Sequence, residues 1–524
     1  MPRKAIFNTR APLIMLKILC TKICNQLYLP KKPNNNYTQN LLPFPSNLKE
    51  SSTTPNQTLV FGLERVLLKS CSIFPYFMLV AFEAGGPLRA LVLLLLYPFV
   101  CLAGEELGLK IMVFVCFVGI KADSFRAGRA VLPKFFLENV GKQGFDMVMK
   151  WERKVGLTNM PRVMVEGFLR EYLGIEDVLG RELKLCCGFF VGLMEEKREQ
   201  FGMEKMDPHH VIGLIGSNTK SFGHELTSLC KAIYLVSEAE KRTWEVLPRE
   251  KYPKPLIFHD GRLAFMPTPL ASLALFMWIP FGSFLFIIRS IVGILLPYKL
   301  SIPILSFTGM QGILLNPKSS FNFSTTPSQK PSKPKGRLYV CNHRTLLDPL
   351  FVSAALMKPL TAVTYSLSKV VESFSPIKTI RLTRNRDTDS KKMKELLSQG
   401  DLVVCPEGTT CREPYLLRFS PLFAELSDEI VPIALDFQVS MLYGTTAGGL
   451  KCLDPVLLLM NPTTICCVKV LDELPRQFKV GKSKFEVANH VQSQISKALD
   501  FECTSFTRKD KYMLLAGNEG IVKL

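Results

Sequence analysis

The chain has 524 residues, 47% of which are hydrophobic, and its formal net charge is +20. This length leaves room for two or three domains with a sizeable core, and so high an apolar content is unusual for a soluble protein. The basic residues are dispersed and no motif with stacking aromatics accompanies them, which argues against a nucleic-acid-binding protein and favours anionic lipid surfaces and phosphate groups as partners. Fifteen cysteines without a Cys-x-x-Cys pair argue against a disulfide framework and a zinc site, and favour a reducing compartment.

The N-terminal segment, residues 1–57, is basic and then polar. It carries no acid before Glu50, and Leu, Ile and Met are interleaved with its Lys and Arg residues. An acid-free basic pattern is typical of a mitochondrial transit peptide, and it equally fits a helix on a membrane surface followed by a linker. We favour the endoplasmic reticulum over mitochondria.

Three apolar segments account for the high hydrophobic content. Leu88–Ala103 and Leu109–Ile120 are each shorter than the ~20 residues that a spanning helix needs, so they predict a re-entrant hairpin or a buried helical pair. Leu270–Ile288 is uncharged, ends at Arg289 and is the best candidate for a transmembrane helix, which Pro280 can kink. We therefore expect the protein to be embedded in a lipid bilayer.

The strongest local pattern follows a linker rich in Ser, Pro and Lys, residues 316–335. The run Arg337–Cys341 predicts a short buried strand. Asp348 and Pro349 then open an apolar helix, with Asp348 in the N-cap position. His343 therefore lies in a turn between a strand and a helix.

This turn can bring His343 and Asp348 together. Two residues five positions apart on an ideal helix point about 140° apart, whereas a turn can fold one back onto the other. A carboxylate that accepts a hydrogen bond from one ring nitrogen supports the imidazolium that forms when the other nitrogen takes a proton, so the pair could deprotonate an alcohol. The structural alternative is that His343 stabilises the turn and Asp348 only caps the helix.

A cluster of arginines follows in Arg381, Arg384 and Arg386. Such a cluster binds phosphate or forms a solvated face, and the pattern alone leaves both open. The cysteines that flank the motifs are interpreted as small buried hydrophobic residues and not as nucleophiles; they are Cys341, Cys405 and Cys411.

The segment from Leu402 onward predicts a buried strand that opens into a Pro-Glu-Gly-Thr-Thr turn. Gly408 permits a positive φ there, and the successive amides up to Thr409 can form an anion-binding nest. Glu407 could accept a hydrogen bond from a hydroxyl of a polyol, and Arg412 offers a fork suited to phosphate.

These blocks occur in an order and spacing that resemble the glycerolipid acyltransferase family: the His-x4-Asp motif, the arginine cluster, the Glu-Gly block after a strand, and a later proline, Pro432. The chain also resembles the land-plant glycerol-3-phosphate acyltransferases over nearly its whole length, including residues 249–255, 259–262 and 508–512. The resemblance implies transfer of a fatty acyl group from acyl-coenzyme A to glycerol 3-phosphate, with preference for the sn-2 hydroxyl.

The resemblance also implies roles for single residues. His343, oriented by Asp348, removes the proton of the acceptor hydroxyl, and Arg384 holds the acceptor phosphate together with Glu407 and Gly408. No metal ion is expected. No cofactor is expected either, because acyl-coenzyme A is a co-substrate. The remaining residues expected to bind substrate are Arg381, Thr409 and Arg412.

In the land-plant family a phosphatase-type domain of the haloacid dehalogenase class precedes the acyltransferase. An intact phosphatase strand has two aspartates followed by glycine, but here Gly62 stands at the nucleophile position, Glu64 at the second acid and Arg65 at the glycine. Glycine can neither form a phosphoaspartate nor ligate a metal. Further along, Gly223 and Glu225 stand where phosphatase-active members carry two metal-binding acids. We expect a phosphatase fold without phosphatase chemistry.

The expected architecture is therefore two α/β domains with membrane-embedded helices. The expected boundaries are 1–57 for the basic segment and linker, 58–245 for the haloacid dehalogenase-like domain with an apolar hairpin at 88–120, 246–300 for a membrane-associated segment, and 301–524 for the acyltransferase domain. Its strands are expected near 337–341, 361–365, 401–405 and 430–437. Two alternatives to the function stay open, an acyltransferase that uses a lysophospholipid and a non-catalytic membrane scaffold.

Overall fold

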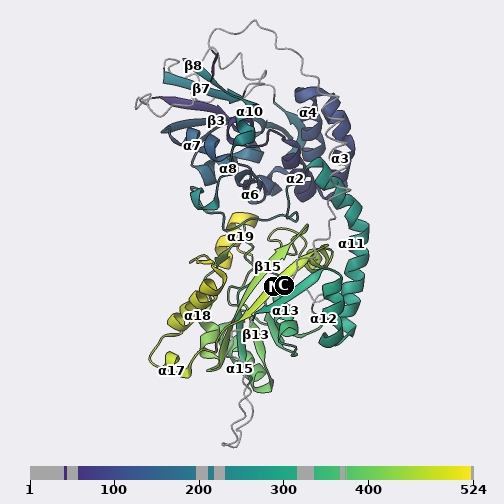
Figure 1. Ribbon diagram of the computed structural model, residues 1–524, viewed down its shortest axis with the longest axis vertical. Helices are drawn as coiled ribbons and strands as arrows, with labels where there is room; N and C mark the ends of the chain where they lie inside the picture. Colours follow the sequence, from purple (N-terminus) through teal and green to yellow (C-terminus); the bar gives the residue numbers. More distant parts are fainter. Residues whose placement is uncertain are drawn as a thin grey trace, which may run out of the picture.

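The computed structural model describes residues 41–43, 57–195, 210–216, 230–315, 336–365, 372 and 375–520. Each half of the chain builds one large β-sheet, and the two halves are stacked along the long axis of the molecule (Figure 1). Most of the basic N-terminal segment, the linker at 316–335, and Gly223 and Glu225 lie outside the described residues.

The N-terminal half is an α/β domain around a six-stranded sheet of order β1-β8-β7-β2-β3-β4, in which every described pairing is parallel. Parallel sheets are covered on both faces, and the central strand β2 is accordingly an apolar run that is buried along its whole length. The strands are β1 Leu41–Pro43, β2 Thr58–Gly62, β3 Arg153–Pro161, β4 Asp177–Arg181, β7 Val211–Gly216 and β8 Ala232–Val236, with a separate hairpin of β5 Leu183–Cys186 and β6 Phe189–Met194. The smaller helices are α5 Ala127–Ala130, α6 Leu132–Leu137, α7 Lys142–Met149, α8 Arg162–Leu173 and α10 Glu238–Thr243.

The apolar hairpin forms two helices, α3 Pro87–Leu102 and α4 Gly104–Phe117, which pack on α2 Phe74–Gly85. Glycines with positive φ make both turns, Gly86 at 87° and Gly104 at 80°. The hairpin is half buried: one face joins the core of the domain, while the other leaves large apolar side chains exposed, among them Leu88, Leu95, Phe99 and Leu102.

Helix α11, Pro269–Leu295, is the long apolar helix that the sequence predicts, and it runs along one side of the molecule from the upper to the lower half (Figure 1). Its 27 residues extend over about 40 Å, and it is the one described helix that is long and apolar enough to cross a membrane. The helix continues past Arg289, where the sequence pattern ended. This guanidinium is buried and donates to the carbonyls of Leu459 and Asn461, each at 2.7 Å, so its charge does not stop the helix.

The C-terminal half is built on a seven-stranded sheet of order β12-β11-β13-β10-β15-β16-β9, parallel except for the β15–β16 pair. The four strands expected from the sequence are confirmed as β10 Leu338–Cys341, β11 Thr361–Thr364, β13 Leu402–Val404 and β15 Ile430–Val439. The others are β9 Met310–Leu315, β12 Lys378–Arg381 and β16 Thr464–Val470, with a short pair of β14 Tyr415–Leu416 and β17 Glu502–Cys503. The helices are α12 Tyr298–Phe307, α13 Asp348–Ala355, α15 Arg386–Gln399, α16 Asp454–Leu459, α17 Arg476–Lys479, α18 Lys484–Leu499 and α19 Arg508–Ala516.

The two halves are joined by buried polar contacts. In the connecting segment, Arg262 donates its amide to Glu83 of α2 at 2.5 Å and its guanidinium to Asp454 of α16 at 2.5 Å. His259 is buried, and its Nε2 lies 2.9 Å from a carboxylate oxygen of Glu413. The connecting segment is therefore joined by specific polar pairs to α2 in the first half and to α16 and Glu413 in the second.

Candidate active site

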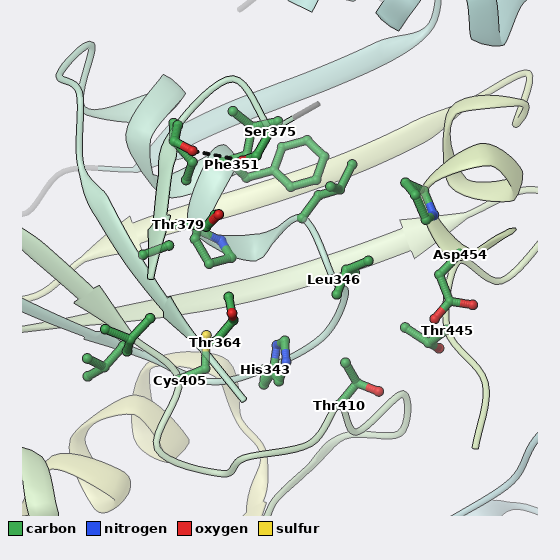
Figure 2. A pocket seen from close by; sticks show the side chains of 18 of the residues that line it. His343, Leu346, Phe351, Thr364, Ser375, Thr379, Cys405, Thr410, Thr445 and Asp454 are labelled. Atoms are coloured by element: carbon green, nitrogen blue, oxygen red, sulfur yellow. Dashed lines mark hydrogen bonds between the residues drawn. The ribbon is translucent and has the colours of Figure 1, made fainter. Parts of the chain in front are cut away.

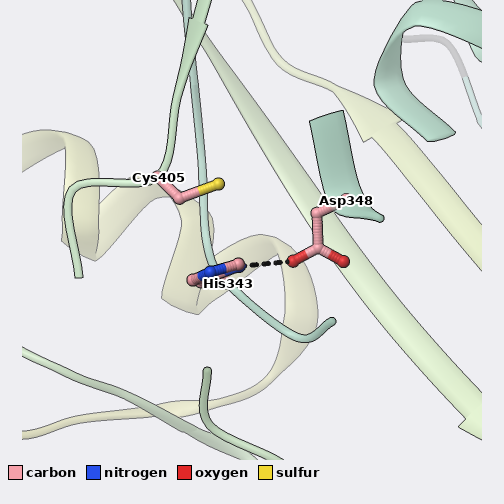
Figure 3. Close-up of side chains that lie close together, drawn as sticks. All are labelled: His343, Asp348 and Cys405. Carbon is pink, nitrogen blue, oxygen red and sulfur yellow. Dashed lines mark hydrogen bonds and ion pairs between the residues drawn. The ribbon is translucent and has the colours of Figure 1, made fainter. Parts of the chain in front are cut away.

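His343 and Asp348 meet in the turn after β10, near the middle of the second sheet. Nδ1 of His343 lies 2.9 Å from Oδ2 of Asp348 (Figure 3). Asp348 is the first residue of α13 and not its N-cap, which is Leu347. Its carboxylate instead accepts hydrogen bonds from the amides of Arg344 at 2.6 Å and Thr345 at 2.9 Å, so it is fixed within its own turn.

The electrostatics favour an imidazole that binds a proton. Burial lowers the pKa of His343, but Cys405 and the hydrogen bond to Asp348 raise it, and the net result is a pKa well above the ordinary 6.5. With Nδ1 held by the carboxylate, Nε2 is the nitrogen left for a substrate. The pair has the arrangement of a general base with its orienting acid.

Cys405 lies beside the pair (Figure 3), and the ligand atoms of His343, Asp348 and Cys405 lie within 4.8 Å of one another. This spacing could hold a metal ion. However, the hydrogen bond with the neighbouring Cys341, whose sulfur is 3.5 Å away, and burial raise the pKa of Cys405. Because Asp348 already accepts several hydrogen bonds from its own turn, the geometry favours a hydrogen-bonded pair over a metal centre.

Glu407 is buried next to His343 and accepts a hydrogen bond from the backbone amide of that residue. One carboxylate oxygen accepts the amide of His343 at 2.7 Å and the other accepts the amide of Leu417 at 3.0 Å. Burial raises the pKa of Glu407 to about 7. The carboxylate therefore positions the catalytic turn, and both of its oxygens are engaged by protein groups.

The arginine cluster divides by its partners. Arg381 pairs with Glu372 at 2.9 Å and Arg386 with Glu425 at 2.7 Å. Arg384 has no ion pair with any described residue, and its backbone has a positive φ of 68°, a conformation that costs a non-glycine residue about 1 kcal/mol or more. Asp389 stabilises this conformation by accepting the amide of Arg384 at 2.9 Å.

The turn after β13 places the remaining predicted residues differently. Gly408 has a φ of 66°, as expected, but its amide donates to the carbonyl of Cys405 at 3.2 Å, so it does not face an anion. Thr409 lines the cavity described below. Arg412 is not brought to that cavity: its guanidinium is buried, donates to Thr445 and stacks 4.2 Å from the ring of Tyr443.

A cavity of about 2160 Å³ joins these residues (Figure 2). Side chains of α11, α12 and α13 make one part of its lining apolar, including Ile291, Leu295, Ile302 and Leu350. His343 and the turn with Thr410 face it from the second sheet (Figure 2). Three basic residues that the sequence analysis did not single out for this role also line it, namely Arg418, Lys451 and Arg508.

The phosphatase-like positions lie at the end of β2. Glu64 is buried and accepts the hydroxyl of Thr158 at 2.6 Å. Arg65 lies where a phosphatase has glycine, and it pairs with Glu105 at 2.9 Å and with Glu238 at 3.6 Å. With Gly62 beside them, these residues offer one engaged carboxylate and one cation, which does not fit a Mg²⁺ site.

Comparison with known proteins agrees with this division of the chain. A family model described as "Glycerol-3-phosphate acyltransferase RAM2-like, HAD-like domain" matches residues 58–236, and an acyltransferase model matches residues 325–436. The chain is 52% identical to the Arabidopsis thaliana protein "Probable glycerol-3-phosphate acyltransferase 3" over 91% of this chain and 93% of that protein. It is 48% identical to "Glycerol-3-phosphate acyltransferase 1" of the same plant over 90% and 83%, and 41% identical to "Glycerol-3-phosphate acyltransferase RAM2" of Petunia hybrida over 88% and 97%.

Proposed function

The chain belongs to the family of plant glycerol-3-phosphate acyltransferases, and we propose that it transfers a fatty acyl group from acyl-coenzyme A to glycerol 3-phosphate, giving lysophosphatidic acid. The observation that carries the proposal is His343, which lies 2.9 Å from the buried Asp348 and on the wall of a cavity that is lined by apolar residues of α11, α12 and α13 and by arginines of other segments. A fatty acyl chain fits the apolar part, and a phosphate fits the arginines.

In the proposed reaction, Nε2 of His343 takes the proton of the acceptor hydroxyl while the oxygen attacks the thioester carbonyl. Asp348 stabilises the imidazolium that forms. The tetrahedral intermediate collapses with cleavage of the carbon–sulfur bond, and the proton returns to the leaving sulfur, which departs as coenzyme A. No acyl-enzyme is needed, because the thioester is already activated, and no metal or cofactor takes part.

General base catalysis contributes typically about 10²–10⁴-fold, so positioning of the two substrates must supply much of the remaining acceleration. We assign the acceptor phosphate to Arg384, whose guanidinium has no ion-pair partner among the described residues, with Arg381 and Thr409 in the same lining. Glu407 acts through the backbone of His343. The family suggests the sn-2 hydroxyl as the acylated position.

We further propose that the protein works at a membrane, for which the endoplasmic reticulum is our choice over mitochondria. The support is the length and apolar surface of α11, together with the exposed apolar side chains of α3 and α4. A lipid product and a lipid donor favour the same location. The N-terminal half, with Gly62 at the nucleophile position, leaves the phosphate on the product.

The test is acyl transfer by the purified full-length chain in detergent or lipid. Labelled glycerol 3-phosphate and acyl-coenzyme A should give lysophosphatidic acid, and His343→Ala should lose the activity while its thermal unfolding is unchanged. Competition by a lysophospholipid acceptor separates the nearest alternative. Full turnover by His343→Ala, or acylation of the lysophospholipid alone, contradicts the proposal.

A further inference from the structure

The C-terminal helix α19 reaches the cavity from outside the acyltransferase motifs. Arg508 and Tyr512, one helical turn apart, both line the cavity, as does Arg384 from the loop after β12. Arg508 and Arg384 line the same cavity, and the charge of Arg384 adds to burial in lowering the pKa of Arg508. Two guanidinium groups from separate segments therefore face the same space.

Among the described residues no carboxylate forms an ion pair with Arg384 or Arg508, and the carboxylate of Glu519, whose charge acts on Arg508, is paired with Lys509. Nη1 of Arg508 donates to the carbonyls of Glu519 at 3.0 Å and Gly520 at 2.7 Å, which carry no net charge. The acid nearest in sequence to Arg508, Asp510, accepts from Thr507 at 2.7 Å and caps the helix.

Asp389, which accepts the amide of Arg384, is also engaged. Asp389 uses one oxygen for the amide of Thr383 at 2.8 Å and the other for the amide of Arg384 at 2.9 Å. By contrast, the neighbouring Lys509 pairs with Glu519 at 2.6 Å. Like charges held together in a partly buried cavity repel one another, and an anion supplied by a ligand removes that cost.

Lys511 fixes the position of α19 against the turn that follows β13. Its buried ammonium donates to the carbonyl of Thr410 at 2.5 Å and to the hydroxyl of the same residue at 3.1 Å. Arg508 stands one turn away on the same helix face. The helix that carries Arg508 is therefore tied directly to the turn that follows β13, and Arg508 has a defined place relative to His343.

We propose that Arg508 is a substrate-binding residue, which together with Arg384 holds a phosphate monoester at the cavity wall, and that this phosphate is the one on the acyl acceptor. A phosphate dianion accepts several charge-assisted hydrogen bonds, and two guanidinium forks from different directions fix its orientation as well as its charge. The choice of the acceptor as its source rests on the proposed function, whereas the phosphate site itself rests on the two guanidinium groups that line the cavity without an ion pair to any described residue.

Steady-state kinetics of Arg508→Ala test the proposal, with Lys509→Ala as the matched control. The KM for glycerol 3-phosphate should rise about tenfold or more in Arg508→Ala, while the KM for acyl-coenzyme A stays within about twofold. Arg508→Lys keeps the positive charge but lacks the guanidinium fork, so its KM for glycerol 3-phosphate should lie between those of the wild type and Arg508→Ala. Lys509→Ala removes the ion pair with Glu519 in the C-terminal segment, so it reports on anchoring of that segment, and both KM values should match the wild type.

An unchanged KM for glycerol 3-phosphate in Arg508→Ala, a rise confined to acyl-coenzyme A, or an equal effect of Lys509→Ala overturns the proposal. A wild-type chain that transfers no acyl group to glycerol 3-phosphate overturns the proposed function instead. In that case inorganic phosphate decides the site: it should raise the unfolding temperature of the wild type and not of Arg508→Ala, and equal stabilisation of both overturns the site as well.

Discussion

Thr158 donates its hydroxyl to Oε1 of Glu64 across 2.6 Å, and the amide of Asn159 donates to the same oxygen at 2.9 Å. These hydrogen bonds engage the carboxylate of Glu64, the one acid retained at the phosphatase-like positions, with groups of the protein itself. The guanidinium of Arg65 occupies the adjacent position and is paired with Glu105. The domain therefore keeps a phosphatase fold, but the guanidinium of Arg65 and the engaged carboxylate of Glu64 occupy the positions where a metal ion would bind.

We accordingly expect the purified chain to release no phosphate from lysophosphatidic acid, with or without Mg²⁺. Gly62→Asp alone should not create the activity, since Arg65 still places a positive charge where the metal belongs. Phosphate release is measured colorimetrically, with an active haloacid dehalogenase phosphatase as the positive control. Release by the wild type that EDTA abolishes contradicts this prediction.

Asp348→Asn tests how the carboxylate supports the base. The transfer needs an unprotonated imidazole, so its rate rises with pH as His343 loses its proton. The hydrogen bond from His343 to Asp348 raises the pKa of His343, and the amide variant lowers that pKa. The ascending limb of the kcat profile should therefore move to lower pH.

The maximal rate of Asp348→Asn should at the same time fall about 10²–10⁴-fold, because the imidazolium loses its counter-charge. The measurement is kcat between pH 5.5 and 9, with exposed Asp428→Asn as the control. An ascending limb at the wild-type position would show that Asp348 does not act on the imidazole.

Glu407→Gln separates two roles for this acid. A carboxylate that holds the acceptor would change the KM for glycerol 3-phosphate, whereas one that accepts the amides of His343 and Leu417 changes kcat. The amide variant can accept only one of these bonds, since its NH₂ group faces a second donor. We expect a lower kcat with unchanged KM and a loss of about 1–3 kcal/mol in unfolding free energy. A selective rise in the KM for glycerol 3-phosphate contradicts the positioning role.

The local elements of the second sheet could be predicted from the sequence because each is a short apolar run bounded by turn residues. The contact between His343 and Asp348 could be predicted from their spacing, because a turn of this length folds the chain back onto itself. Arg412 could not be placed in this way. Its partners, Thr445 and Asp260, are far away in the sequence and only the fold brings them to the guanidinium.

The same limit applies to the basic lining of the cavity. Arg381, Arg384 and Arg386 look alike as sequence, and only the positions of Glu372 and Glu425 distinguish the neutralised arginines from Arg384. Arg508 stands at the other end of the domain in sequence, in a segment that could be matched to the family but not to the cavity.

The contact between the two halves offers a test of stability. Arg262 and Asp454 are both nearly buried, and Nη1 of Arg262 lies 2.5 Å from the carboxylate. Arg262→Ala leaves a buried carboxylate without its partner, which costs about 3 kcal/mol or more at a pH where Asp454 is charged. The double variant with Asp454→Asn should recover part of this loss, because no unpaired charge remains.

The loss in Arg262→Ala should also depend on pH. Burial already raises the pKa of Asp454 to about 6 against the ordinary 3.8, so the folded state holds more protons than the unfolded state between these values, and this carboxyl contributes less stability as the pH rises. Without Arg262 the pKa rises further, and the decline extends to higher pH. The difference in unfolding temperature between Arg262→Ala and wild type should therefore be larger at pH 8 than at pH 5.5, as measured by intrinsic fluorescence in detergent. An equal difference at the two pH values would mean that the charge of Asp454 does not stabilise the contact between the two halves through Arg262.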